Sequence, residues 1–120
     1  MKVAISSVGK TLDSAIDPRF GRAASFILVD TDTGEHQAVD NSQSLHAMQG
    51  AGIQAAETVA RLSADYVITG HCGPKAFRAL QSAGIKVILG VEGTAADAVE
   101  KFKSGEIQPS ENADVQGHWV

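Results

Sequence analysis

Apolar and polar positions repeat along the chain with two different periods, which together predict an α/β domain. Short apolar runs predict β-strands at residues 2–6, 25–31, 64–70 and 85–90, and residues 35–40 predict a further, charged strand. The letters DTG between the second and third of these strands in chain order are typical of a hairpin turn. Charge in the second arm of the hairpin is typical of a strand at the edge of a sheet.

Three segments instead repeat with the period of a helix. The first begins at Gly52, and its predicted buried face holds Ile53, Ala56, Val59, Ala60 and Ser63. The second has Pro74 at its first position and Gly84 just past its end, with an apolar stripe of Ala76, Phe77 and Leu80. The third has Thr94 and Asp97 spaced as a capping box and ends at Gly105.

The predicted order of elements is β-ββ-α-β-α-β-α, which favours three layers around a mixed sheet. The last two strands each follow a helix, so they are expected to run parallel through right-handed crossovers, whereas the hairpin adds an antiparallel strand. A chain of 120 residues suits one core. We expect one domain over residues 1–105 and a loosely ordered, polar tail over 106–120, from which Trp119 could dock on the body.

Composition and charge narrow the classes of function. Hydrophobic content of 43% and charged content of 20% are ordinary for a globular protein, and no apolar run approaches the roughly 20 residues of a membrane span. The first residues lack the features of a signal peptide, and one cysteine cannot form an internal disulfide. We therefore expect a cytoplasmic protein without a membrane partner. A net charge of −4 disfavours nucleic acid as a partner.

A ligand is expected where the parallel strands end, because open α/β sheets bind ligands at the carboxyl ends of their strands. Three loops are predicted to meet there, at residues 7–24, 70–74 and 90–94. They contain Gly70, Gly73, Gly90 and Gly93, which allow close approach of backbone to a ligand, and the cationic candidates Arg19, Arg22, His71 and Lys75. The helix that begins at Pro74 presents amide groups that favour an anion. These features together predict an anion pocket.

A thiol phosphatase is an alternative interpretation of the turn that contains Cys72. The letters HCGPKAFR match the spacing of a nucleophilic cysteine and an arginine, here Cys72 and Arg78, and a cysteine before a helix is a candidate nucleophile. Two features count against this reaction. Pro74 lacks an amide hydrogen for phosphate, and Arg78 lies roughly 6 Å further along the helix, on the same face as Lys75.

Metal sites built only from protein ligands are disfavoured. One cysteine is too few for a thiolate-ligated iron–sulfur centre, and the candidate ligands lack the paired spacing of a zinc site: His36, His46, His71, Cys72 and His118. A pre-formed cluster that carries its own sulfide remains compatible, because the protein need only hold an anion. The order of elements also resembles that of ribonuclease H-type nucleases, but the first strand, KVAIS, carries no carboxylate for two-metal chemistry.

Two stretches and the final helix resemble a known family. The segments DPRFGRAASFILVD (17–30) and GAGIQAAETVARLSADYVITGHCGPKAFRALQSAGIKVI (50–88) resemble the dinitrogenase iron–molybdenum cofactor biosynthesis family, the NifX-like proteins, over about residues 2–104. The resemblance implies a ribonuclease H-like fold, a sheet order of 3-2-1-4-5, and binding of metal–sulfur clusters or their precursors without catalysis. The length and the GHCGPKAF turn are most similar to a subgroup from sulfate-reducing bacteria that holds a molybdenum–copper–sulfide cluster non-covalently.

The resemblance also implies roles for individual residues. Arg19, Phe20, Gly21 and Arg22 would line the pocket, and His71 and Cys72 would lie in the turn that faces the cluster. The residues themselves add Gly70, Gly73, Lys75 and His46 as further candidates for binding. His71 and Cys72 are the candidate metal ligands, although many members of the family carry other residues at this pair. From the residues alone, Phe20 favours core packing, and Cys72 is either an inert thiol or a group facing the ligand. His46 lies in a loop that either covers the site or is simply polar.

Three functions therefore stay open. The first is a carrier without turnover that binds an anionic metal–sulfur cluster, either molybdenum–copper–sulfide or an iron–molybdenum–sulfur precursor, and exchanges it with donor or acceptor proteins. Such clusters are large, soft anions that suit arginines, amides and a histidine. The second is the thiol phosphatase. The third is a regulatory module that binds a protein partner through the same face.

Overall fold

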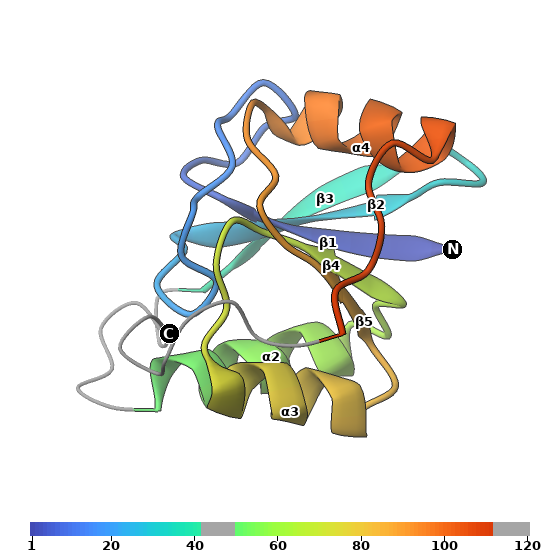
Figure 1. Ribbon diagram of the computed structural model, residues 1–120. Helices are drawn as coiled ribbons and strands as arrows, with labels where there is room; N and C mark the ends of the chain where they lie inside the picture. The colour runs from blue at the N-terminus through green and yellow to red at the C-terminus, as the bar shows by residue number, and fades with distance from the viewer. Residues whose placement is uncertain (42–49, 112–120) are drawn as a thin grey trace.

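A five-stranded mixed sheet forms the centre of the protein (Figure 1). The computed structural model describes residues 1–41 and 50–111. Its elements in chain order are β1 (Lys2–Ser7), β2 (Ser25–Asp30), β3 (His36–Asp40), α2 (Ala51–Arg61), β4 (Tyr66–Ile68), α3 (Pro74–Ser82), β5 (Lys86–Ile88) and α4 (Ala95–Ser104). Among the described residues, no helix has the length and apolar character needed to cross a membrane.

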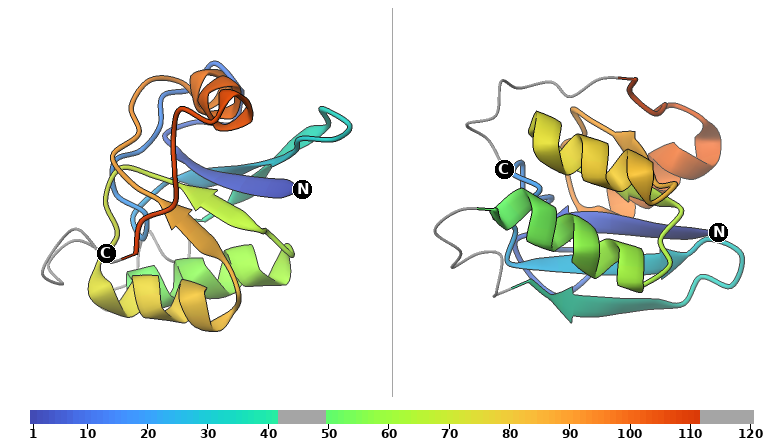
Figure 2. Two further views of the ribbon diagram at one scale, coloured as in Figure 1. Left: turned by 45° about the vertical axis from the view of Figure 1, so that its right-hand side comes forward. Right: turned by 90° about the horizontal axis from the view of Figure 1, so that it is seen from below.

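The strand order is β3-β2-β1-β4-β5, which confirms the order that the family resemblance implied. β1 pairs antiparallel with β2 and parallel with β4, and β2 and β3 form the predicted hairpin. β4 and β5 are parallel. The helix α4 covers one face of the sheet, and α2 and α3 cover the other, so the predicted three layers are confirmed (Figures 1 and 2).

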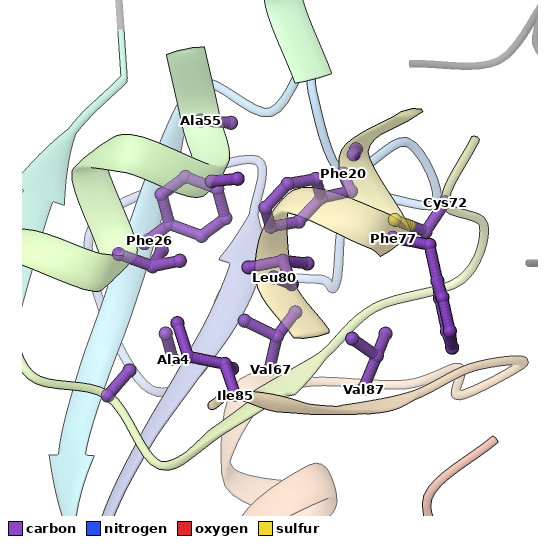
Figure 3. Close-up of a cluster of buried hydrophobic side chains, with 14 of the residues drawn as sticks. Ala4, Phe20, Phe26, Ala55, Val67, Cys72, Phe77, Leu80, Ile85 and Val87 are labelled. Carbon is purple, nitrogen blue, oxygen red and sulfur yellow. The ribbon is translucent and has the colours of Figure 1, made fainter. Parts of the chain in front are cut away.

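The two faces of the sheet bury different apolar side chains, because successive residues of a strand point to opposite sides. Val3 and Ile5 of β1 pack on the α4 side with Ile27, Ile68 and Ile88. Ala4 packs on the α2 and α3 side with Phe26, Val67, Leu80 and Val87 (Figure 3). The central strands are therefore apolar at nearly every position, as their continuous apolar runs indicated.

Local signals placed the ends of α3 and α4 correctly, whereas α2 begins at Ala51, one residue before the predicted Gly52. Pro74 is the first residue of α3, and Thr94 and Asp97 form the capping box of α4, with each side chain accepting a hydrogen bond from the other residue's backbone N–H. The hydrogen bond from the Thr94 N–H is the main cause that lowers the pKa of Asp97. Gly105 ends α4 in the left-handed conformation, with φ of 80°.

The predicted buried face of α2 was partly wrong. Ile53 is 39% exposed, whereas Ala51, Gly52, Ala55, Ala56 and Val59 are buried. The helical period was predicted correctly, but the buried face of α2 is rotated about the helix axis toward the alanines and Gly52. These let α2 pack closely on the sheet and on α3, while Ile53 lies at the border of the buried face.

The residues that follow α4 contact the body of the protein up to residue 111. Ile107 packs against the core on the α4 side, and the Ser110 N–H donates a hydrogen bond of 2.7 Å to the Val87 carbonyl. This bond lies on the outer edge of β5, so the segment protects a strand edge that would otherwise be unpaired. Trp119 and His118 lie outside the described residues.

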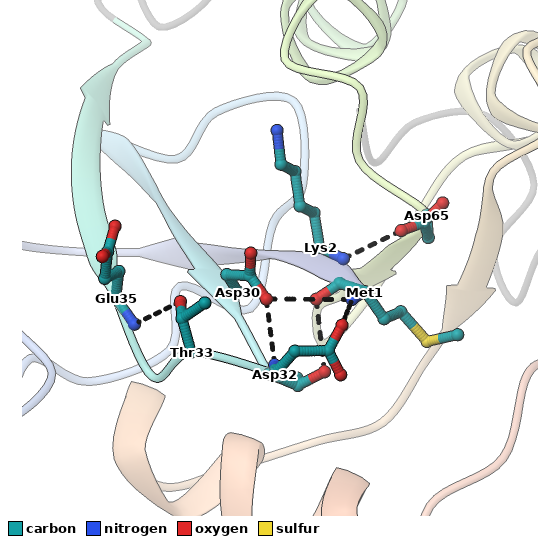
Figure 4. A network of polar contacts seen from close by, with 8 residues as sticks. Met1, Lys2, Asp30, Asp32, Thr33, Glu35 and Asp65 are labelled. Atoms are coloured by element: carbon teal, nitrogen blue, oxygen red, sulfur yellow. Dashed lines mark hydrogen bonds and ion pairs between the residues drawn. The ribbon is translucent and has the colours of Figure 1, made fainter.

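Polar contacts hold together the edge of the sheet at which β1 begins (Figure 4). The Met1 amine lies 2.7 Å from Asp32 Oδ2, and the Lys2 N–H donates to Asp65 Oδ2 at 2.8 Å. The hydrogen bond with Asp32 is the main cause that raises the pKa of the Met1 amine. Asp30 accepts a hydrogen bond from the Asp32 N–H, which lowers the pKa of the Asp30 carboxyl. The acidic residues of this edge therefore lie at the opposite end of β1 from the candidate site.

Candidate functional site

The carboxyl ends of the three parallel strands meet at one edge of the sheet, as the sequence predicted. The long loop after β1 runs across the other two strand ends. Along it, the Ile16 N–H donates to Gly93 O at 2.9 Å and the Asp17 N–H donates to Ser6 O at 3.0 Å. Further along, the Ala95 N–H at the start of α4 donates to Ser14 O at 3.0 Å. The Gly90 N–H donates to Gly70 O at 2.9 Å, so the three predicted loops are joined through their backbones.

The arginine-bearing part of this loop lies directly beside the His71 turn. The His71 N–H donates to the Pro18 carbonyl at 2.7 Å, and the Phe20 N–H donates to the His71 carbonyl at 3.1 Å, so Arg19 and His71 form a parallel bridge. Segments separated by about fifty residues in the chain are therefore held side by side. This contact is the central geometric feature of the site.

Gly70 has a different role from the expected one. A Cβ at this position would lie 2.8 Å from both Cα and the carbonyl oxygen of Pro18. The sequence predicted that Gly70 allows a ligand to approach the backbone, but the group that approaches is the chain itself. Glycine is needed here because the two segments pack backbone against backbone.

A small buried polar network supports the same contact. Ser6 Oγ donates to Asp17 O at 2.7 Å and lies 2.7 Å from Thr69 Oγ1. The buried Asp17 carboxylate accepts the Arg19 N–H at 3.0 Å, and the half-exposed Arg19 Nε lies 3.9 Å from it. Sequence reasoning did not place Ser6, Asp17 or Thr69 in the site. The available signal was a hydroxyl residue at the end of each of two apolar strands.

Two predicted lining residues have their side chains in the core. Phe20 is fully buried with its ring centroid 5.3 Å from that of Phe26, which confirms the preference for core packing (Figure 3). Cys72 is also fully buried, with Sγ 3.7 Å from Gly73 O, in the same core region as Phe77. Its burial counts against Cys72 as the nucleophile of a phosphatase and as a ligand to a pre-formed cluster that arrives from solvent, because both of these roles need an accessible sulfur.

The remaining candidate side chains are at or near the surface. Arg19, Lys75 and Arg78 are exposed, and Arg22 and His71 are half-buried.

Among the candidate glycines, Gly21 and Gly73 are buried. Gly93 has φ of 103°, so its turn needs glycine for the backbone conformation itself. His46 lies outside the described residues. Within residues 1–41 and 50–111, no three His, Cys, Asp or Glu residues are grouped closely enough to hold a metal ion.

The starts of α3 and α4, which both lie at this end of the sheet, differ in charge. The N-terminus of α4 carries its own carboxylate, Asp97, in the capping box. The N-terminus of α3 has Gly73 at the N-cap, no side-chain cap and no acidic residue in its first turn, which contains Lys75. The partial positive charge of α3 is therefore not offset by its own first turn.

Comparisons with known proteins agree with this geometry. The orange protein from Desulfovibrio gigas, in its apo form, is similar at 43% identity with a TM-score of 0.93, covering 95% of this chain and 96% of that chain. A putative NifB protein from Thermotoga is similar at 33% identity with a TM-score of 0.83, covering 97% and 98%. An uncharacterised protein from Methanocaldococcus jannaschii is 24% identical over 92% of this chain and 97% of its own length.

The subgroup that the sequence resembled is that of the orange protein, and the structural similarity agrees with it. The model of the family described as "Dinitrogenase iron-molybdenum cofactor" matches residues 1–105. The chain therefore belongs to the dinitrogenase iron–molybdenum cofactor family, the NifX-like proteins.

Proposed function

We propose that this protein is a carrier that binds an anionic metal–sulfur cluster non-covalently at the carboxyl edge of its sheet, without turnover of its own. The observation that carries the proposal is the backbone bridge between Arg19 and His71. It brings the arginine-bearing segment to the uncapped start of α3. Membership of the family supports a role with cofactors of this kind.

The negative charge and the polarisable sulfur atoms of a metal–sulfur cluster explain why it would bind at the carboxyl ends of these strands. A thiometallate spreads negative charge over large sulfur atoms, so several cations and amide dipoles stabilise it better than one tight ligand set does. Arg19, Arg22 and Lys75 supply fixed positive charge, and the first turn of α3 supplies backbone N–H groups. Asp17 partly offsets the charge of Arg19. Similarity to the orange protein favours molybdenum–copper–sulfide as the cargo, with an iron–molybdenum–sulfur precursor as the alternative.

The phosphatase alternative has less support. Its nucleophile would be Cys72, which is fully buried, and its arginine would be Arg78, which is exposed on α3. A buried thiol in an apolar core is inert toward a phosphate ester in water. Hydrolysis of p-nitrophenyl phosphate at the same rate by wild type and by Cys72→Ser would remove this alternative.

Reconstitution tests the proposal. Tetrathiomolybdate and copper are added to the protein, the mixture is passed through gel filtration, and metal and sulfide in the protein peak are measured. We expect a coloured complex that contains one cluster per protein chain. Absence of metal and of visible absorption from the protein peak would overturn the proposal.

Charge reversal then locates the site. Arg22→Glu is expected to weaken retention of the cluster roughly 10- to 100-fold, because an attractive charge becomes repulsive near a multiply charged anion. Arg61→Glu is the matched control, since Arg61 is exposed in the last turn of α2, near the opposite edge of the sheet. Unchanged uptake in Arg22→Glu would instead favour the regulatory module, in which the same face binds a protein.

A further inference from the structure

Asn41, which directly follows β3, makes an unusual set of hydrogen bonds to the arginine-bearing segment. Its backbone N–H donates to Ala24 O at 3.1 Å. Its side-chain Nδ2 donates to Ala23 O at 2.8 Å and lies 3.4 Å from Gly21 O. Every one of these contacts ends on a carbonyl oxygen within residues 21–24, the stretch that contains Arg22.

The chemistry of the neighbours explains why this residue is an asparagine. Asn41 is only 3% exposed, and its Oδ1 is buried without a hydrogen-bond partner in the described part of the chain. A buried acceptor without a partner is destabilising, so a residue that only filled space would be better replaced by an apolar one. The side-chain neighbours are both acceptors, and a neutral amide is the group of this size that offers two N–H donors. Asn41 Oδ1 therefore lacks a partner among the described residues because the side chain is oriented to donate from Nδ2 to the carbonyl oxygens of Ala23 and Gly21.

The segment is fixed on its other side by different contacts. The Phe20 N–H bonds to the His71 carbonyl, and the Phe20 ring is buried against Phe26. Arg22 thus lies between two fixed points of the backbone. Phe20 precedes it, and Asn41 bonds to the carbonyls of Gly21, Ala23 and Ala24 on either side of it. Between them there is little freedom left for the backbone of Arg22.

We propose that Asn41 is a positioning residue for cluster binding, because its amide fixes residues 21–24 and thereby sets the place of Arg22 at the carboxyl edge of the sheet. The inference rests on the proposed function, in which Arg22 binds the cluster. Asn41 itself does not touch the cluster. It acts by lowering the conformational freedom that Arg22 would lose on binding.

Asn41→Asp tests the donor role with almost no change in shape. The carboxylate cannot donate, and it repels the Ala23 and Gly21 carbonyls. The backbone NMR order parameters of residues 21–24 are expected to fall from about 0.85 toward 0.6, while those of β1 stay unchanged. Retention of thiomolybdate and copper is expected to weaken roughly tenfold.

Lowering the pH gives a readout that a role in packing alone would not move. Burial raises the pKa of the introduced carboxyl, and once protonated it can donate one hydrogen bond to Ala23 O. The order parameters of residues 21–24 in the variant should therefore recover as the pH falls, whereas those of wild type should not change. Asn41→Leu, which also removes both donors but cannot titrate, should lose order at every pH.

Gln81→Glu is the matched control, because it makes the same amide-to-carboxyl change near the end of α3, away from residues 21–24. Unchanged order parameters in both Asn41 variants, or wild-type retention of the cluster by Asn41→Asp, would overturn the inference. Failure of wild type to take up the cluster would overturn the proposed function together with this inference. Uptake by wild type and by Asn41→Asp alike would overturn this inference alone.

Discussion

Gly70→Ala is expected to separate the two halves of the candidate site. The added Cβ would lie 2.8 Å from the Cα and the carbonyl oxygen of Pro18, closer than Cβ atoms approach backbone in folded proteins. No flexible side chain is available to move away, so one of the two backbones must shift. The hydrogen bonds at risk are His71 N–H to Pro18 O, at 2.7 Å, and Phe20 N–H to His71 O, at 3.1 Å.

The magnitude follows from these contacts. Overpacking of a well-packed site costs about 1–3 kcal/mol, and each hydrogen bond that is lost adds about 1 kcal/mol. We therefore expect the free energy of unfolding to fall by about 2–4 kcal/mol. Urea denaturation followed by circular dichroism measures this change, and gel filtration with thiomolybdate and copper measures retention of the cluster. Both should decrease.

Gly84→Ala provides the control. Gly84 has φ of 77°, and a Cβ added there would have no atom within 4 Å, so its replacement strains the backbone without any clash. It should cost about 1–2 kcal/mol and leave retention of the cluster unchanged. Wild-type stability and wild-type retention in Gly70→Ala would refute the reasoning, because they would mean that the contact between the two segments does not constrain the site.

Further predictions concern the core and the helix cap. Thr94→Ala should lower the free energy of unfolding by about 1 kcal/mol, and Thr94→Gly by only a few tenths, in urea denaturation; equal losses would contradict the capping role. Because the pKa of Asp97 is lowered in the folded state, its contribution to stability is present above the pKa of the unfolded chain and is lost as the pH falls through the folded pKa. The acid-side decline in stability should therefore be smaller in Asp97→Asn. Leu80→Ala should cost about 2–5 kcal/mol, because Leu80 is fully buried and the change leaves a cavity. Cys72 should react with a thiol reagent in urea but hardly at all in buffer, and Cys72→Ala should retain the cluster; loss of the cluster in that variant would restore Cys72 as a ligand.

The order of the elements and the ends of α3 and α4 could be predicted because the signals are local, whereas the predicted strands at 64–70 and 85–90 are longer than β4 and β5. The apolar runs of β1 and β2, Pro74 before α3, and the Thr94–Asp97 capping box each depend on residues close to one another in the chain. The rotation of α2 could not be predicted, because Ile53 is a strongly apolar residue and most of the buried positions are occupied by alanines and glycine. The fit against the sheet and α3 decided which side of α2 is buried.

The candidate site divides in the same way. Its general place followed from the rule that parallel strands bind ligands at their carboxyl ends, and the charges of Arg19, Arg22, His71 and Lys75 followed from the letters alone. The burial of Cys72 could not be predicted from the sequence, because a thiol before a helix is equally compatible with an open turn and with a core position. The hold of Asn41 on residues 21–24 also went unpredicted, since nothing in its neighbourhood along the chain shows which carbonyls it will meet.

By itself, the sequence determined the periods of the strands and helices, the ends of α3 and α4, and the family to which the chain belongs. Only the tertiary structure decided which distant backbones touch: Gly70 with Pro18, His71 with Phe20, and Asn41 with Ala23. The physical reason is that periodicity and caps arise from interactions within one or two turns of chain. Contacts across twenty to fifty residues depend instead on how the completed elements pack against one another.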